Sequence, residues 1–472
     1  MIPMTVGEIA RIVGGRPDHL DPHVEVTGRA EFDSRRVRPG DLFLAFPGER
    51  ADGNDYAQAA VDAGAVAVLS TRSVPTGSVV VSDPLAAISA LATAASRRLA
   101  ATVIGVTGSS GKTSTKDLLA QVLSGLGTTV APPGSFNNEL GYPYTVLLAD
   151  AGTRFLVLET SARGIGHITH LTAIARPQLG IVLNVGHAHV GEFGSVQAIA
   201  QAKGELVEAL PSQADGGAAI LNADDPLVAA MAERTTAQVI RFGESEQADV
   251  RAVDLRVPES GRPEFLLSIA GQSAPVVLSV HGRHQVGNAL AAAAAAWRLG
   301  MPVGEIGRAL SAATASSRWR MEVTTTEDGI TVVNDAYNAN PESMLAGLAA
   351  LMSMSHGRRS VAVLGQMAEL GDASEAEHVR VGRAVADLGV ARALIVGRAA
   401  SGIRHGAEQA GMTDVEAVAD VEAATERLRA ILEPGDVVFV KASRSVGMER
   451  VAEAIVRAHV RPAAVALAEG VQ

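Results

Sequence analysis

The sequence lacks cysteine, a long apolar run and any excess of basic residues. With no cysteine among 472 residues, disulfide bonds and thiolate chemistry are excluded, which suits a cytoplasmic chain. No apolar run reaches the ~18 residues that cross a bilayer, and the first residues form neither a basic nor an apolar leader segment. The formal net charge of −11 argues against broad electrostatic binding to nucleic acid or to an anionic membrane. An anionic ligand must therefore be held by local donors.

One stretch, residues 103–119, has the order of strand, small-residue loop and helix. Residues 103–106 are short, apolar and mostly β-branched, which is typical of a buried strand. The loop consists of Gly108, Ser109, Ser110 and Gly111. From residue 112 the apolar residues recur at helical spacing. The stretch therefore predicts a strand that runs through a glycine loop into a helix.

This arrangement predicts a phosphate-binding site. Backbone N–H groups of a glycine loop and of a helix N-terminus both attract anions. Lys112 supplies a full charge for the β- and γ-phosphates, and the hydroxyl of Thr113, followed by Ser114, suits Mg²⁺. The standard motif has a glycine where Val106 stands, so an ordinary strand–helix turn with a chance Gly-Lys-Thr is the alternative.

The length predicts roughly three domains at ~150 residues each, and we place them at residues 1–99, 100–315 and 316–472. In the first we expect helices near 5–13, 56–63 and 84–98 with strands at 42–46 and 65–69. In the second, apolar runs at 155–159, 179–184 and 218–222 each end in a polar residue, as in a parallel sheet. Residues 236–282 predict an antiparallel flap or side sheet, followed by helices at 288–299 and 303–313. Strands at 330–334, 361–364, 393–396 and 437–440 make the third domain another doubly wound sheet.

Polar residues end several of the predicted parallel strands of the second domain. Glu159, Asn184 and Asn222 should lie at the same sheet edge as the Lys112 loop, because ligands collect beyond the carboxyl ends of parallel strands. Glu159 is placed to reach Mg²⁺, directly or through water. A buried carboxylate without a partner is costly, so a nearby cation is expected.

Four polar groups leave a binding role and a structural role open. Asn137 and Asn138 suit a polar ligand, but a turn also uses asparagine. Ser34 and Arg35 suit a phosphate, or belong to a solvated loop. His187 and His189 are metal-ligand candidates, although a single histidine is more often structural. Lys203 lies in a helical stretch, where a solvated lysine is the alternative.

The third domain opens on Arg318-Trp319-Arg320 and continues to a second polar cluster. A cation of this opening segment is able to swing onto a γ-phosphate across the domain interface. Asp335 follows a strand and suits a ribose hydroxyl, while Tyr337, Asn338 and Asn340 precede the next helix. Lys441 also follows a strand, where it suits a carboxylate.

Five motifs occur together along nearly the whole chain. They are Thr107-Gly-Ser-Ser-Gly-Lys-Thr113, Ser135-x-Asn-Asn-x-x-Gly-x-Pro143, the 184–194 segment, Gly282-Arg-His-Gln-Val-Gly-Asn288 and Asn334-Asp-Ala-Tyr-Asn-Ala-Asn-Pro341. In this order they resemble the Mur ligase family. The Ser135–Gly141 stretch, residues 337–341 and residues 363–372 most resemble the members that add D-alanyl-D-alanine, and the Asp-Asn-Pro-Arg motif of the diaminopimelate-adding members is absent.

The resemblance implies an α/β chain of three domains: an N-terminal UDP-sugar-binding domain, a central P-loop-like ATPase with a mostly parallel sheet, and a C-terminal Rossmann-like doubly wound sheet. It implies an ATP-dependent amide ligase of peptidoglycan precursor synthesis, monomeric and cytoplasmic, with no nucleic acid partner. ATP would phosphorylate a carboxylate of UDP-N-acetylmuramoyl-tripeptide, and the amine of D-alanyl-D-alanine would attack the acyl phosphate to give the pentapeptide, ADP and phosphate. The alternatives are a diaminopimelate- or lysine-adding or folylpolyglutamate synthase-like ligase, or a non-catalytic nucleotide-binding regulator.

The resemblance also implies roles for individual residues. The loop from Gly108 to Ser114 would hold ATP, with Lys112 and Arg318 at the transferring phosphoryl group and Arg320 as the neighbouring alternative. Two Mg²⁺ ions would be bound, the first by Thr113 and Glu159, the second by His189 (or His187) and a carbamylated Lys203. Asn288 would read the adenine and Asp335 the ribose. Ser34 and Arg35 would meet the uridine diphosphate, with Asn137, Asn138, Tyr337 and Asn338 around the reacting peptide. Carbamylation requires burial to lower the pKa of Lys203, because a lysine must lose its proton to react with CO₂.

Overall fold

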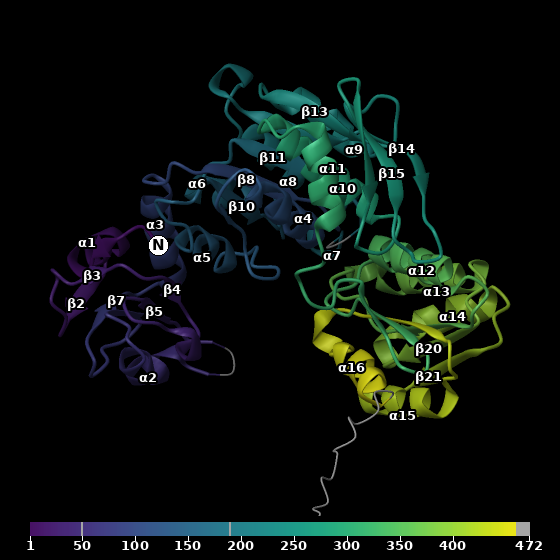
Figure 1. The fold of residues 1–472 in the computed structure, drawn as a ribbon. Coiled ribbons are helices and arrows are strands. Elements are labelled where there is room, and N and C mark those ends of the chain that lie inside the picture. The colour runs from purple at the N-terminus through teal and green to yellow at the C-terminus, as the bar shows by residue number, and fades with distance from the viewer. Residues whose placement is uncertain (49–50, 188–189, 459–472) are drawn as a thin grey trace, which may run out of the picture.

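Three main β-sheets organise the chain in the computed structural model (Figure 1), which describes residues 1–48, 51–187 and 190–458. The sheet nearest the N-terminus, in purple and blue, and the sheet nearest the C-terminus, in green and yellow, lie on either side of a larger central sheet. Most neighbouring strands in all three sheets are parallel and are joined by helices. The predicted α/β class is therefore confirmed.

The first unit is a small sheet with helices packed on it. Its strand order is β2 (Arg16–Asp18), β7 (Ser78–Val80), β6 (Ala67–Ser70), β5 (Leu42–Ala45) and β4 (Ala30–Glu31), and a separate ladder pairs β1 (Met4–Thr5) with β3 (Glu25–Val26). The helices are α1 (Val6–Val13), α2 (Ala57–Asp62) and α3 (Pro84–Ser96). The Asp83 carboxylate caps α3 by accepting two backbone N–H groups, and Pro84 occupies a position that needs no N–H. The helix therefore starts where the sequence predicts it.

The central sheet has nine strands within the described residues, in the order β16-β15-β14-β13-β12-β11-β8-β10-β9. They are β8 (Thr102–Thr107), β9 (Thr129–Val130), β10 (Phe155–Glu159), β11 (Leu179–Val182), β12 (Ala218–Asn222), β13 (Gln238–Gly243), β14 (Val250–Arg256), β15 (Glu264–Ile269) and β16 (Gln272–Val277). Its helices are α4 (Lys112–Ser124), α5 (Gly141–Leu147), α6 (His167–Ile174), α7 (Val190–Phe193), α8 (Val196–Glu208), α9 (Pro226–Ala229), α10 (Gln285–Arg298) and α11 (Val303–Ala312). Strand β8 pairs in parallel with β10 and β11, so that Glu159 lies beside Val106 and Val182 beside Thr107. These three strands consequently end together at one edge.

The segment 236–282, predicted as an antiparallel flap or side sheet, continues the central sheet. Strand β13 pairs in parallel with β12, and β14 pairs in parallel with β13. Only β15 and β16 add antiparallel ladders. The predicted antiparallel flap is thus found at β15 and β16, but β13 and β14 extend the central sheet in parallel, because alternation along a strand reports one solvated face and says nothing of which strand lies beside it.

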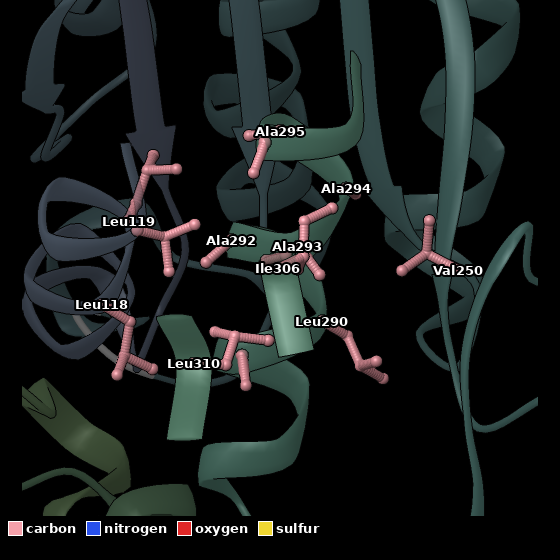
Figure 2. Close-up of a cluster of buried hydrophobic side chains, with 14 of the residues drawn as sticks. Leu118, Leu119, Val250, Leu290, Ala292, Ala293, Ala294, Ala295, Ile306 and Leu310 are labelled. Atoms are coloured by element: carbon pink, nitrogen blue, oxygen red, sulfur yellow. The ribbon is translucent and has the colours of Figure 1, made fainter. Parts of the chain in front are cut away.

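The alanine-rich helix α10 forms the centre of the largest core. Residues 289–296 of this helix have no exposed surface. Helix α10 packs on α4 and on strands β12 to β14, and Figure 2 shows its alanines between leucines of α4 and Val250 of β14. Because alanine side chains are small, the helix must approach the sheet closely to leave no voids in the interior. This packing supports helix α4 and with it the loop at its N-terminus.

The third unit is a six-stranded sheet, counted over the described residues, in the order β17-β18-β22-β19-β20-β21. Its strands are β17 (Glu322–Thr325), β18 (Thr331–Asn334), β19 (Ser360–Leu364), β20 (Arg392–Val396), β21 (Val415–Val418) and β22 (Val437–Lys441). Its helices are α12 (Pro341–Ser355), α13 (Ser374–Asp387), α14 (Ser401–Gln409), α15 (Val421–Ile431) and α16 (Glu449–Ala458). Asn340 and Ser343 form a reciprocal capping box at the start of α12. No helix in the described ranges is both long and apolar enough to cross a membrane.

Candidate active site

A cavity of about 340 Å³ lies where the central sheet meets the third unit. We call its two sides the central wall and the C-terminal wall. The central wall contains residues 109–114, Asn137, Asn138, Glu159, Ser161, Arg163, Asn184 and Asn288, and the C-terminal wall contains Arg320, Asp335, residues 337–340, Glu342 and Lys441. The cavity thus gathers residues that follow β8, β10, β11, β18 and β22, as expected for ligand sites at the carboxyl ends of parallel strands.

The glycine loop between β8 and α4 is held open toward the cavity. The N–H groups of Ser109 and Ser110 donate to the backbone and side-chain oxygens of Asn184, at 3.1 and 2.9 Å. Gly111 has a φ of 81°, and a Cβ there would lie 2.4 Å from Asn288 Oδ1. No described side chain caps the N-terminus of α4. Its first N–H groups therefore remain for a bound anion.

Lys112 begins helix α4 and folds back over the loop. Its Nζ donates to the carbonyl oxygen of Gly108 at 2.6 Å. Burial lowers the pKa of Lys112, the charge of Glu159 opposes this shift, and Arg320 adds to it. The amine of Lys112 therefore lies against the backbone of the glycine loop and lines the cavity.

Glu159 is held beside Thr113 at the base of the cavity. The carboxylate is only 1% exposed. One oxygen accepts from Thr113 Oγ1 at 3.1 Å, and the other accepts from Asn137 Nδ2 at 2.7 Å. Thr113 Oγ1 also lies 2.6 Å from Ser135 Oγ. A carboxylate and a hydroxyl next to a phosphate loop are the oxygen ligands that Mg²⁺ uses, so these residues fit that ion.

The structure brings Arg320, and not Arg318, to the phosphate loop. Arg320 donates to Thr113 Oγ1 at 3.1 Å and to Ser135 Oγ at 2.8 Å, and its guanidinium lies 4.2 Å from the ring centre of Tyr337. The Arg318 side chain is 70% exposed and pairs with Glu453 at 3.1 Å. The placement of Arg318 at the phosphates is thus corrected in favour of Arg320. The physical reason is the backbone, since the residues on either side of Arg320 have positive φ values of 59° and 51°.

The C-terminal wall is built around a buried ion pair. Lys441, at the end of β22, pairs with the carboxylate of Asp335 and donates to the carbonyl oxygen of Asn338 at 2.9 Å. The other oxygen of Asp335 accepts from the N–H of Met321 at 3.1 Å. Burial lowers the pKa of Lys441, and Asp335 opposes that shift. Asp335 lines the cavity, but part of its hydrogen-bonding capacity is already used.

Asn288 and Asn138 both line the cavity and both have partners in the protein. Asn288 Oδ1 accepts from Thr115 Oγ1 at 3.1 Å, and its Nδ2 donates to Gln285 Oε1 at 2.9 Å. Asn138 Oδ1 accepts from the N–H of Gly141 at 2.9 Å, which fixes the turn before α5. Asn138 thus takes part in the turn that the sequence allowed for, and it also lines the cavity. Asn288 gains its position from the first turn of α10.

Lys203 is buried within helix α8, so the solvated alternative is excluded. Its exposure is 5%. Burial, and to a lesser degree the charge of Lys112, lower the pKa of Lys203 well below its ordinary value. The shift favours the neutral amine that carbamylation needs. His189 lies outside the described residues, and the imidazole of His187 meets Glu342 of α12 at 2.7 Å.

Ser34 and Arg35 lie in the first unit, in the short 3₁₀ helix Ser34–Arg36, and not among the residues of the cavity. Arg35 donates twice to the carboxylate of Asp33, each time at 2.8 Å, and its side chain is largely exposed. Asn222 stands at the expected sheet edge, where it donates to the backbone of Leu183 rather than lining the cavity. Ser34 and Arg35 therefore belong to a different surface from the phosphate loop, whereas Asn222 lies at the predicted sheet edge but outside the cavity lining.

The sequence analysis missed Arg163, His284 and Glu342 as cavity residues. Arg163 lies four residues after β10, and Glu342 lies in the first turn of α12, which follows β18. Both residues could have been predicted from the rule that ligands bind beyond the carboxyl ends of parallel strands. His284 sits just before α10, and burial lowers its pKa. No local pattern distinguishes it from an ordinary core histidine.

The fold and the cavity define a nucleotide-dependent enzyme with a phosphate loop and a facing second sheet. Family comparisons agree: residues 106–296 match the Mur ligase middle domain, residues 319–444 the Mur ligase glutamate ligase domain and residues 30–100 the Mur ligase family catalytic domain. The chain belongs to the Mur ligase family. It is 50% identical to UDP-N-acetylmuramoyl-tripeptide–D-alanyl-D-alanine ligase of Mycobacterium tuberculosis, across 97% of this chain and 98% of the relative.

Two solved structures are similar over most of the chain. The UDP-N-acetylmuramoylalanyl-D-glutamyl-2,6-diaminopimelate–D-alanyl-D-alanyl ligase of Acinetobacter baumannii is 30% identical with a TM-score of 0.80, covering 96% of this chain and 98% of its own. The MurF ligase of Thermotoga maritima in complex with ADP is 29% identical with a TM-score of 0.76, covering 92% and 98%. Sequence and fold therefore agree across the whole length, not only at the motifs.

Proposed function

We propose that the chain joins D-alanyl-D-alanine to UDP-N-acetylmuramoyl-tripeptide at the expense of ATP, giving the pentapeptide precursor of peptidoglycan. The observation that carries this assignment is the 50% identity to a curated ligase of that activity over 97% of the chain. The solved ADP complex of a similar ligase supports ATP as the nucleotide. The absent Asp-Asn-Pro-Arg motif disfavours the diaminopimelate-adding alternative.

The chemistry requires a carboxylate to be activated next to an anionic nucleotide. A carboxylate is a poor electrophile, and phosphorylation by ATP converts it into an acyl phosphate that an amine attacks. Lys112 and Arg320 would offset charge on the transferring phosphoryl group. Two contacts support these roles: Lys112 donates to a carbonyl oxygen of the glycine loop, and Arg320 donates to Thr113. Asn137 and Asn138 would lie beside the acyl group.

Magnesium would be held at the base of the cavity by Thr113 and Glu159. The ion would supply positive charge between the phosphates, the role that Mg²⁺ usually has in phosphoryl transfer. For a second ion, a carbamylated Lys203 would act as a carboxylate, together with His189. The support for this second site is the burial and lowered pKa of Lys203.

The three units would divide the substrates between them. We assign residues 1–99 to the UDP-sugar through Ser34 and Arg35, residues 100–315 to ATP, and residues 316–472 to closure over the nucleotide and the incoming dipeptide. Asn288 would read the adenine. On the facing wall Asp335 would meet the ribose, with Tyr337 and Asn338 near the peptide. We further propose a monomer acting in the bacterial cytoplasm, which size-exclusion chromatography and cell fractionation test.

The deciding experiment measures phosphate release from ATP with UDP-muramoyl-tripeptide, with and without D-alanyl-D-alanine. Release that requires both substrates and yields a UDP-pentapeptide is expected. Release supported by one free amino acid and a shorter UDP-peptide would retain the mechanism and reassign the chain to another ligase of the family. Nucleotide binding without release under any of these conditions would favour a regulator.

A further inference from the structure

Arg163 is an exposed residue that differs from the other cations lining the cavity. Lys112 bonds a loop carbonyl, Arg320 bonds two hydroxyls, and Lys441 is paired with an acid. Arg163 lines the same cavity, but its guanidinium makes no hydrogen bond or ion pair within the described part of the chain. A planar cation without a partner is suited to bind a carboxylate through two parallel hydrogen bonds.

The backbone that carries Arg163 is fastened on both sides. Before it, Ser161 Oγ donates to the carbonyl oxygen of Asn137 at 2.9 Å. After it, the carboxylate of Glu205 on α8 accepts the N–H groups of Gly166 and Thr169, the latter at 2.9 Å. Glu205 is buried, so it caps α6 from a fixed position. The loop presents Arg163 from a supported backbone, which reduces the entropy lost when a ligand is bound.

The position of this loop favours the acyl substrate over the other two substrates. Arg163 lies on the central wall, which also carries Glu159 and Asn138. Helix α6, which the loop precedes, packs against α3 of the first unit, the unit assigned above to the UDP-sugar. A UDP-peptide that runs from the first unit to the phosphate loop would therefore pass this side of the cavity.

We propose that Arg163 binds a spectator carboxylate of the UDP-muramoyl-tripeptide, that is, a carboxylate other than the one phosphorylated by ATP. The proposal rests on the proposed function and names a specificity residue for it. Two groups of such a peptide have this chemistry. A glutamyl residue within a peptide chain retains one free carboxylate, and a terminal 2,6-diaminopimelate has a second carboxylate that a terminal lysine lacks.

The test compares wild type with Arg163→Ala, Arg163→Lys and a matched control, Arg97→Ala. Arg97 is an exposed arginine at the end of α3, away from the cavity. Initial rates are measured with diaminopimelate- and lysine-containing UDP-tripeptides, and binding of each peptide is measured by calorimetry without ATP. We expect Arg163→Ala to raise KM and Kd for UDP-tripeptide about 10- to 100-fold, as for loss of a charged hydrogen-bonded pair. KM for ATP and kcat should stay near wild type, Arg163→Lys should recover part of the loss, and Arg97→Ala should match wild type.

Each outcome separates the two sources of the carboxylate. A loss confined to the diaminopimelate peptide identifies its second carboxylate, and an equal loss with both peptides identifies the glutamyl carboxylate. Unchanged KM and Kd for both peptides, or an effect on ATP or D-alanyl-D-alanine alone, overturns the proposal. If wild type forms no pentapeptide, the proposed function itself fails. An active wild type with an unaffected Arg163→Ala variant rejects only the role of Arg163.

Discussion

The two walls of the active-site cavity treat buried lysines in opposite ways. On the C-terminal wall Lys441 is 3% exposed, and its charge is matched by Asp335 within the protein. Behind the central wall Lys203 is almost as deeply buried, and within the described part of the chain the causes that lower its pKa are burial and the repulsion of Lys112. One lysine is thus a completed structural pair, and the other is an amine whose charge the protein disfavours.

This difference suggests how the work is divided between the walls. A buried pair that is already satisfied gives its surroundings a fixed shape, here the wall that carries Asp335 and Asn338. A buried amine with no acid partner among the described residues is costly to keep charged, which supports the chemical role proposed above for Lys203. Replacement of Lys203 is therefore expected to reduce activity, and replacement of Lys441 is expected to reduce stability.

The largest effect on stability is expected from Lys441→Ala. The change leaves the carboxylate of Asp335 buried without its partner, which should lower the free energy of unfolding by about 3–5 kcal/mol. Chemical denaturation measures this loss. The double variant Lys441→Ala/Asp335→Ala should recover much of it, because neither charge then remains alone. A Lys441→Ala variant as stable as wild type would contradict the structural role of the pair.

The largest effect on turnover is expected from Lys203→Ala. Under the proposed function the variant loses a carbamate that would hold the second Mg²⁺, so kcat should fall about 10²- to 10³-fold, the size seen when one transition-state stabilising group is removed. ATP binding should persist. In ¹³CO₂-saturated buffer, carbon NMR should show a carbamate signal in wild type that the variant lacks. A fully active variant, or a wild type with no carbamate signal, would place Lys203 outside the chemistry.

The next effect separates two arginines that stand two residues apart. Arg320→Ala should reduce kcat/KM about 10- to 100-fold, because it removes a charged donor that contacts Thr113. Arg318→Ala should change kcat/KM by less than about fivefold, since exposed ion pairs contribute little. Steady-state kinetics of the two variants decide the matter. A larger loss in Arg318→Ala would show that the third unit rearranges during catalysis.

The pH dependence of stability offers a smaller, complementary test of Lys203. Since its pKa is lower in the folded than in the unfolded protein, the unfolded state binds more protons at pH values between the two. Wild-type stability should then rise with pH toward the ordinary lysine pKa of about 10.4. Lys203→Met lacks this dependence and should be more stable than wild type in CO₂-free, metal-free buffer. The difference in the free energy of unfolding should be largest near neutral pH and should shrink as pH rises. An advantage independent of pH would indicate a packing effect instead.

The smallest effect concerns the contact between the two walls. Glu342 on α12 accepts from both the backbone N–H and the imidazole of His187, at 3.1 and 2.7 Å. Glu342→Ala should raise KM for ATP about two- to fivefold, as expected for a partly exposed pair that helps hold the walls together. Glu342→Gln should act more weakly, because an amide oxygen still accepts a hydrogen bond. Unchanged kinetics in both variants would mean that this contact does not contribute to closure.

Several features of the site were predictable from local sequence because they depend on local rules. The glycine loop before Lys112 and the Asp83-Pro84 start of α3 follow from backbone preferences. The polar residues at or just after the ends of β10 and β11 follow from short apolar runs that each end in a polar residue. The order of the motifs was also sufficient to indicate the family. These properties need no knowledge of distant contacts.

The tertiary structure decided what depends on distant partners. Residues 236–282 joined the central sheet because strand neighbours are chosen by packing, and Arg320 replaced Arg318 because positive φ values on either side set its direction. The pairing of Lys441 with Asp335, and the burial of Lys203 without an acid among the causes of its shift, likewise arise from segments far apart in the chain. By itself the sequence determined which elements form and which chemistry they carry. Only packing determined which of those side chains share the cavity, because burial and charge pairing are properties of the assembled sheets.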